Sequence, residues 1–195
     1  MAMGRPREFD AEQALESALK VFWMKGYEGT SMPDLTAAMG INRPSLYAAF
    51  GNKEQLFRKA LDRYTEKAQK RFAEALATKT AREAVANVLG SIADTCACTE
   101  TPKGCLLVQG ALSCGDDAAP IREELARRRN GSEEMWRARF AKGIADGDLP
   151  QDTNAEALAR YIVTVTEGLA VRSAGGATSE DLKPVVAFAL KAFPG

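Results

Sequence analysis

Apolar side chains recur at the three- and four-residue spacing of one helix face along most of the 195-residue chain. Between residues 10 and 25, Ala14, Ala18 and Phe22 follow this spacing. The pattern predicts helices over residues 10–25, 31–39, 42–50, 53–77, 80–97, 104–113, 119–146, 154–173 and 179–193. Because no segment shows the alternation of a strand, we expect an all-α protein.

Residues that cap helices define the expected boundaries. The expected starts are marked by Ser31 with Asp34, Asn42, Asn52 with Gln55, Thr153 with Glu156, and Thr178 with Asp181. Gly26 and Gly40 are placed to end the first two helices. The pair Asn130-Gly131 favours a kink or a break inside the helix predicted over 119–146.

The segment from Ser31 to Lys53 has the proportions of a helix-turn-helix. Two short helices are joined by Met39-Gly40-Ile41, where the glycine permits a tight turn. The second helix would present donors to a DNA groove, and a lysine at a helix start suits a phosphate. Spacing alone fits equally well two capped helices of an ordinary bundle.

Composition excludes several functions without selecting one. Lys plus Arg and Asp plus Glu both total 26, so net charge points to no partner. The chain has no histidine, the commonest general base and metal ligand. With no nucleophile–base pair, metal cluster or phosphate loop visible, we expect a protein that is not an enzyme and needs no metal or cofactor. We also expect no signal peptide and no membrane span, and therefore a cytoplasmic protein with reduced thiols.

The run "GYEGTSMPDLTAAMGINRPSLYAAFGNKEQLFRKAL", residues 26–61, resembles the DNA-binding domain of the TetR family of transcriptional regulators. Gly-Tyr before Thr-Ser, the Ala-Met-Gly-Ile turn, Leu-Tyr followed by Phe, and Asn-Lys-Glu with a following Leu match in order and spacing. The likeness covers about the first third of the chain. Ala49 departs from the pattern, because many members carry a histidine there.

The resemblance implies a homodimeric repressor that binds double-stranded operator DNA, an inverted repeat, and releases it when a small-molecule inducer or reactive electrophile binds. It divides the chain into a three-helix DNA-binding domain, 1–52, and a ligand-binding and dimerisation bundle, 53–195, with 53–77 as connector. The expected DNA-binding residues are Arg5, Arg7, Thr30, Ser31, Asn42, Arg43, Ser45, Tyr47 and Lys53. The alternative is a small-molecule-binding helical module without specific DNA recognition.

The second part of the chain carries two apolar stripes and a mixed set of pocket candidates. Members of the family pair their last two helices, so we expect both stripes to take part in the dimer interface: Leu158, Tyr161, Ile162, Val165, Leu169, Val185, Val186 and Ala189. We expect the ligand pocket between the central helices. Its candidates for binding or sensing are Cys105, Leu106, Gln109, Trp136, Phe140 and Thr164.

The four cysteines allow several interpretations. Their spacing, Cys96, Cys98, Cys105 and Cys114, matches no known zinc pattern, and small buried hydrophobic residues are the ordinary reading. Cys105 differs, because it falls in the predicted first turn of a helix beside Lys103, where dipole and charge favour a thiolate. Its Gly-Cys-Leu context resembles a branch of TetR-like regulators, some of which sense electrophiles or oxidants. Cys105 is thus either a sensor or a buried residue of the pocket.

Overall fold

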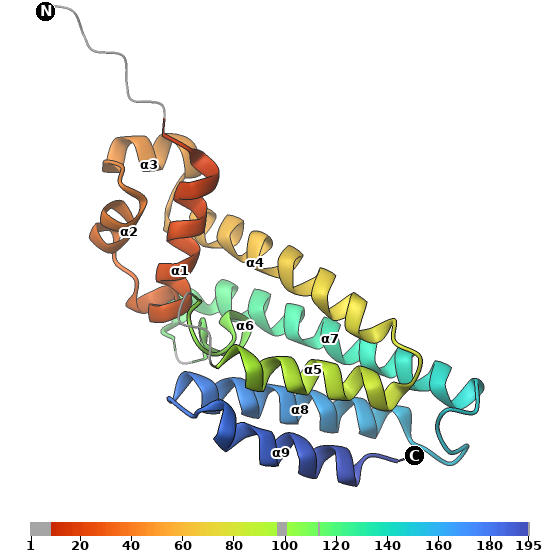
Figure 1. Ribbon diagram of the computed structural model, residues 1–195. Helices are drawn as coiled ribbons and strands as arrows, with labels where there is room; N and C mark the ends of the chain where they lie inside the picture. Colours follow the sequence, from red (N-terminus) through yellow and green to blue (C-terminus); the bar gives the residue numbers. More distant parts are fainter. Residues whose placement is uncertain (1–8, 97–100, 113, 195) are drawn as a thin grey trace, which may run out of the picture.

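A computed structural model describes residues 9–96, 101–112 and 114–194, and it confirms the all-α prediction. Its helices are α1 (Ala11–Gly29), α2 (Met32–Met39), α3 (Arg43–Phe50), α4 (Lys53–Leu76), α5 (Ala81–Thr95), α6 (Leu106–Gln109), the short 3-10 helix η1 (Asp116–Ala118), α7 (Ala119–Ala145), α8 (Ala155–Ala174) and α9 (Ser179–Ala192). Figure 1 shows α1, α2 and α3 as a small head, from which α4 runs along the bundle of α5, α7, α8 and α9. No helix among the described residues is long and apolar enough to cross a bilayer.

Local sequence signals determine most helix starts. The side chains of Ser31, Asn52 and Thr178 each accept the backbone N–H three residues later, and Asp34, Gln55 and Asp181 bond back to the capping residues. These reciprocal bonds satisfy backbone donors that a helix start would otherwise leave unpaired. The predicted capping boxes are therefore confirmed at α2, α4 and α9.

Three boundaries differ from the predictions. The start of α8 is capped by Asn154, whose Oδ1 accepts from the Ala157 N–H at 3.0 Å, so the predicted Thr153 cap was wrong by one residue. The α7 helix continues through Asn130-Gly131, because both halves are anchored by buried side chains, Ile121 and Leu125 in one hydrophobic cluster and Trp136 and Phe140 in another.

The third difference is α6, which has only four residues instead of the predicted ten over 104–113. Gly104 has φ +82°, a left-handed conformation that cannot open an α-helix. A Cβ at this position would also lie 2.9 Å from the Cβ of Ala174, closer than real Cβ atoms approach, so the site favours glycine on both counts. The chain therefore reaches α6 through an extended Cys105.

The head shares a hydrophobic core with the body. Leu35, Leu46 and Phe57 belong to one buried cluster that also includes Leu106 of α6 and Leu125 of α7. A second cluster lies among α5, α7, α8 and α9 around Trp136, and Phe72 of α4 packs against it. Helix α4 thus contributes to both cores, which makes it the main structural link between the head and the bundle (Figure 1).

Candidate nucleic-acid interface

The turn between α2 and α3 has the geometry that the sequence predicts. Gly40 ends α2 with φ +67°, and its N–H donates to the Thr36 carbonyl. The Ile41 N–H also donates to that carbonyl, at 3.3 Å. Asn42 then caps α3 by accepting from the Ser45 N–H at 2.9 Å. These bonds hold α2 and α3 as a helix-turn-helix.

One face of α3 packs on the core and the other is open. Leu46 and Phe50 are buried, whereas Arg43 is exposed and Tyr47 is 49% exposed. Among the described residues, Arg43 makes no ion pair or side-chain hydrogen bond. The open face therefore offers a guanidinium and a phenol to a partner, and Ala48 beside them allows close approach.

The start of α2 is held by a charged contact that sequence reasoning missed. Lys25 Nζ of α1 lies 2.6 Å from Asp34 Oδ1, while Asp34 Oδ2 accepts from the Ser31 N–H and hydroxyl. Hydrogen bonds from Lys25 and then Ser31 hold the pKa of the Asp34 carboxyl well below its ordinary value. The exposed Ser31 is therefore part of a capping box tied to α1.

Lys53 begins α4, but its ammonium group is not fully free in solvent. Its Nζ lies 4.7 Å from the centre of the Tyr27 ring, a cation–π contact. Burial against that ring lowers the Lys53 pKa, and the negative charge of Glu28 opposes this shift. The stacked ring restrains the ammonium group at the start of a helix, where free backbone N–H groups also favour an anion.

Thr30 departs from the expected interface. It is 1% exposed, and its hydroxyl donates to the Gly26 carbonyl at 2.6 Å. This bond follows the break in α1 at Gly26, whose φ of +69° is left-handed. The Thr30 hydroxyl is thus committed inside the protein and shapes the turn into α2. Arg5 and Arg7 lie outside the described residues.

Lys59 supports the end of α3, where the sequence has Ala49 in place of the histidine of many family members. Its Nζ donates to the Ala49 carbonyl at 3.2 Å and lies 5.6 Å from the centre of the Phe50 ring. A lysine on α4 thus binds the C-terminal end of α3, a favourable place for a positive charge. The contact joins residues ten apart and has no local sequence signal.

The candidates for ligand binding separate into two places. Leu106 and Cys105 pack with the cluster that includes the head, whereas Trp136 and Phe140 stack in the cluster of the bundle. Thr164 is exposed, and its hydroxyl donates to the Arg160 carbonyl. The structure therefore does not bring the six residues into one pocket, and Gln109 lies near α1 instead of among the central helices.

Cys105 is half-buried and free, and it contacts a buried tyrosine. It precedes α6 without capping it, so the expected position in a full first helical turn was wrong, and four residues carry only a small dipole. The Tyr64 hydroxyl donates to Cys105 Sγ at 3.4 Å. Burial, with the neighbouring thiol, raises the pKa of Tyr64 well above its ordinary value.

Among the described residues, no group of three or more His, Cys, Asp or Glu could hold a metal.

The residues predicted for dimerisation divide between core and surface. Ile162, Leu169, Val186 and Ala189 are buried against the protomer's own helices. Tyr161 and Val185 are exposed, with Leu158 and Val165 partly so. Phe188, absent from the prediction, is 72% exposed, the largest fraction among the exposed large hydrophobic residues. Its spacing of three residues from Val185 marks a second apolar face of α9 that could have identified it.

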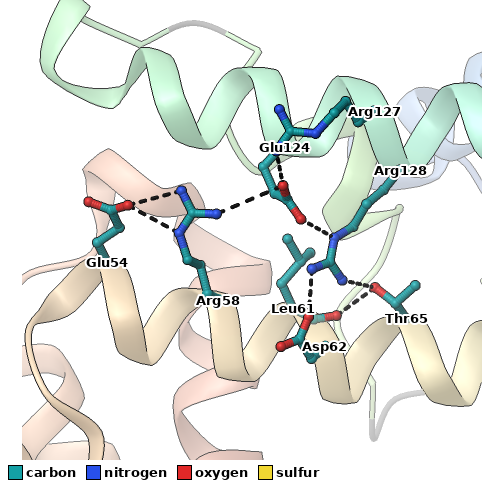
Figure 2. A network of polar contacts seen from close by, with 8 residues as sticks. All are labelled: Glu54, Arg58, Leu61, Asp62, Thr65, Glu124, Arg127 and Arg128. Carbon is teal, nitrogen blue, oxygen red and sulfur yellow. Dashed lines mark hydrogen bonds and ion pairs between the residues drawn. The ribbon is translucent and has the colours of Figure 1, made fainter.

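A network of charges joins α4 to α7 beside the head (Figure 2). Glu124 of α7 accepts from Arg128 Nε at 2.8 Å, pairs with Arg127, and lies 3.8 Å from Arg58 of α4. Arg128 also contacts Asp62 and donates to the Thr65 hydroxyl at 2.9 Å. Hydrogen bonds from Arg128 and then Arg127 hold the pKa of the Glu124 carboxyl below its ordinary value, although burial opposes the shift. The network fixes the connector helix against the bundle.

Known proteins of similar sequence share this architecture. A model of the bacterial regulatory proteins of the tetR family matches residues 14–60, and the tetracyclin repressor-like C-terminal domain matches residues 81–183. The HTH-type transcriptional repressor ComR of Escherichia coli K12 is 33% identical over 193 residues, covering 98% of this chain and 92% of ComR. The repressor AcnR of Corynebacterium efficiens is 30% identical, covering 90% and 87%.

A solved structure adds a complex with nucleic acid. A cysteine-substituted TetR family regulator, CifR, complexed with 26-bp double-strand operator DNA, is 43% identical to this chain. The TM-score is 0.94, and the alignment covers 98% of this chain and all of the CifR chain. The similarity therefore extends through the head, the connector and the bundle.

Proposed function

Because the chain belongs to the TetR family of bacterial regulatory proteins, we propose that it is a transcriptional repressor that binds double-stranded operator DNA through α2 and α3. The observation that carries the proposal is the exposed face of α3, where the side chains of Arg43 and Tyr47 are open to solvent. This face lies between the capped starts of α3 and α4. Two similar regulators named as repressors and the operator complex of CifR support it. Such a protein acts in the cytoplasm.

Within this proposal the contacts divide by chemistry. Arg43 and Tyr47 face base edges or nearby phosphates, and Ser45 and Asn42 lie at the start of the same helix. Lys53 binds phosphate at the start of α4. We place the boundary between the DNA-binding and ligand-binding parts of the chain at Asn52, which caps the connector helix α4.

We propose that the protein acts as a homodimer through α8 and α9. The exposed large apolar side chains of these helices, Tyr161, Val171, Val185 and Phe188, are not covered by other parts of the described protomer. Burying such a patch against a second copy removes apolar surface from water. A two-fold axis relates the two α3 helices, so the operator is an inverted repeat with half-sites about 34–36 Å apart or a multiple of this.

The proposed inducer is a small molecule or a reactive electrophile, with Cys105 as the candidate sensor. The free thiol lies at the junction of α4 and α6, where an adduct needs extra volume. Packed helices respond to added volume by shifting, and α4 transmits a shift to the head. The alternative is a thiol that serves only as packing.

A band shift tests the repressor proposal. The full chain is incubated with DNA fragments that flank its gene and with unrelated fragments of equal length. Tight binding to one flanking fragment, resistant to excess unrelated DNA, is the expected result. Binding that is equal for all fragments would favour a helical module without specific DNA recognition.

A further inference from the structure

Helix α1 is broken at Gly26, and the break leaves two of its backbone groups to pair with α6. In an unbroken helix the Tyr27 N–H would donate to the Trp23 carbonyl, four residues earlier. With Gly26 at φ +69°, the Tyr27 N–H donates instead to the Gly110 carbonyl at 2.8 Å. The Trp23 carbonyl accepts from Gln109 Nε2 at 3.0 Å. These groups of the head are therefore bonded to the end of α6 and not to each other.

The side chain of Tyr27 extends this connection to the start of α4. Its ring packs edge-on against Phe57, with 5.1 Å between the ring centres. The Lys53 Nζ lies 4.7 Å from the centre of the same ring. Within the part of the chain that the structure describes, Lys53 makes no ion pair or hydrogen bond, so its three N–H groups remain available to a phosphate. Tyr27 thus contacts the end of α6 through its backbone and Lys53 through its ring.

The residue after Tyr27 is bonded to the same part of the chain. Glu28 Oε1 accepts from the Gly115 N–H at 2.9 Å. Burial lowers the pKa of Lys53, and the negative charge of Glu28 opposes that shift. Two successive residues of the head therefore join the chain that follows α6 to the surroundings of one ammonium group.

We propose that Tyr27 is a positioning residue, which holds the Lys53 ammonium group for a DNA phosphate and transmits the position of α6 to that contact. The inference rests on the proposed DNA binding, and it adds a route that does not require a shift along the length of α4. Cys105 lies directly before α6, and Gly110 lies directly after it. A shift of α6 would move the Gly110 carbonyl, and with it Tyr27 and the ring that restrains Lys53. Binding is then weaker, because the ammonium group has to be ordered when DNA binds.

A double-mutant cycle tests the role of the ring. Fluorescence anisotropy measures the affinity of the full chain for the fragment that flanks its gene and for unrelated DNA, at several salt concentrations. Tyr27→Leu should weaken binding to both about two- to fivefold, the contribution of a cation–π contact at a partly exposed site. The slope of log K against log salt should not change, because Lys53 keeps its charge. Tyr27→Phe, which keeps the ring, should bind as the wild type does. In a Lys53→Ala background, Tyr27→Leu should have no effect.

A second cycle tests the link to α6. A Cβ at Gly110 would lie 2.6 Å from the Leu106 carbonyl oxygen, so Gly110→Ala has to shift the backbone at this point. It should weaken DNA binding at least about twofold in the presence of Lys53, and this loss should disappear in the Lys53→Ala background. Gly131→Ala on α7 is the matched control, because a Cβ at that position has no contact within 4 Å outside its own helix backbone. It should change binding in neither background.

The outcomes separate this inference from the repressor proposal. Equal effects of Tyr27→Leu with and without Lys53, or binding by Tyr27→Leu as tight as that of the wild type or tighter, would overturn the positioning role. A loss for Gly110→Ala that persists without Lys53 would overturn the link to α6. Equal affinity for all fragments would contradict the repressor proposal alone, since a phosphate contact does not depend on sequence and both cycles can still be measured. Absence of binding to any DNA would overturn both proposals. If Tyr27→Leu does not fold, the same cycle with Tyr27→Met decides.

Discussion

The Tyr64 hydroxyl donates a hydrogen bond to the Cys105 sulfur, with 3.4 Å between the two atoms. Because its pKa is raised well above the ordinary value, Tyr64 remains protonated and keeps this donor at neutral pH. The bond joins the connector helix α4 to the start of α6. Modification of Cys105 would break it and place new atoms between the two elements.

The first prediction concerns this thiol. An electrophile such as N-ethylmaleimide should modify Cys105 before Cys96, Cys98 and Cys114, and operator DNA should be released in proportion. Adducts are mapped by mass spectrometry while DNA binding is followed in parallel. The Cys105→Ser variant should stay bound, and Cys114→Ser should respond as the wild type does. Release by Cys105→Ser at the same dose would show that this thiol is not the sensor.

The second prediction concerns Lys53. Replacing it by alanine should weaken binding to all sequences similarly and reduce the slope of log K against log salt by about 0.9, the loss of one phosphate contact. Lys191→Ala, which removes the same charge from an exposed position of α9, should alter neither the affinity nor the slope. Fluorescence anisotropy at four salt concentrations measures both. An unchanged slope for Lys53→Ala would exclude a phosphate contact.

The third prediction concerns the exposed face of α9. Phe188→Asp should shift the protein from dimer to monomer in sedimentation velocity, because a charge would be buried at the centre of an apolar contact. The protomer should remain folded, since Phe188 is 72% exposed. Met135→Asp, also an exposed apolar residue but on α7, should remain dimeric. A wild-type protein that sediments as a monomer would contradict the proposed interface.

The fourth prediction concerns Glu124 and the charges in Figure 2. Its pKa is lowered in the folded protein from the ordinary 4.5, so the unfolded state binds more protons and the carboxylate stabilises the fold above that value. This contribution is lost as pH falls through the lowered pKa. Glu124→Gln should lower the free energy of unfolding by about 1–3 kcal/mol at pH 7, because Arg127 and Arg128 lose their carboxylate partner. The loss should be smaller at lower pH.

Thermal unfolding between pH 7 and pH 3 measures this effect. Glu134→Gln is the matched control, because Glu134 pairs on the surface of α7 with Arg137 and does not contact α4. It should change stability little at any pH. An equal loss of stability for both variants, or a loss for Glu124→Gln that is as large at pH 3 as at pH 7, would contradict the role of the network.

The sequence predicts the parts of this architecture that depend on near neighbours. The two capping boxes each join residues three apart, Ser31 with Asp34 and Asn52 with Gln55. They can therefore be recognised in the sequence, and they mark where α2 and α4 begin. The Lys53–Tyr27 contact and the Trp23–Gln109 pairing join residues far apart in the chain. No local pattern encodes such contacts, and they appear only once α1 is packed against α4 and α6.

Periodicity also could not separate a core face from an interface face. Val186 and Ala189 are buried in the protomer, while Val185 and Phe188 on the same helix are exposed. Both pairs have helical spacing, so a hydrophobic pattern on α9 is compatible with either assignment. The packing of α9 against α5 decides which face remains open.

The central claim is that α3 reads operator DNA through Arg43 and Tyr47. The most direct measurement is the affinity of the Arg43→Ala/Tyr47→Ala double variant for the operator fragment and for unrelated DNA, by fluorescence anisotropy, with Arg137→Ala as the control for loss of one surface arginine. Each good base contact contributes about 1–3 kcal/mol of discrimination, so the double variant should lose at least about tenfold in operator preference while the control keeps it. Undiminished operator binding by the double variant, with its fold intact, would remove α3 from the interface.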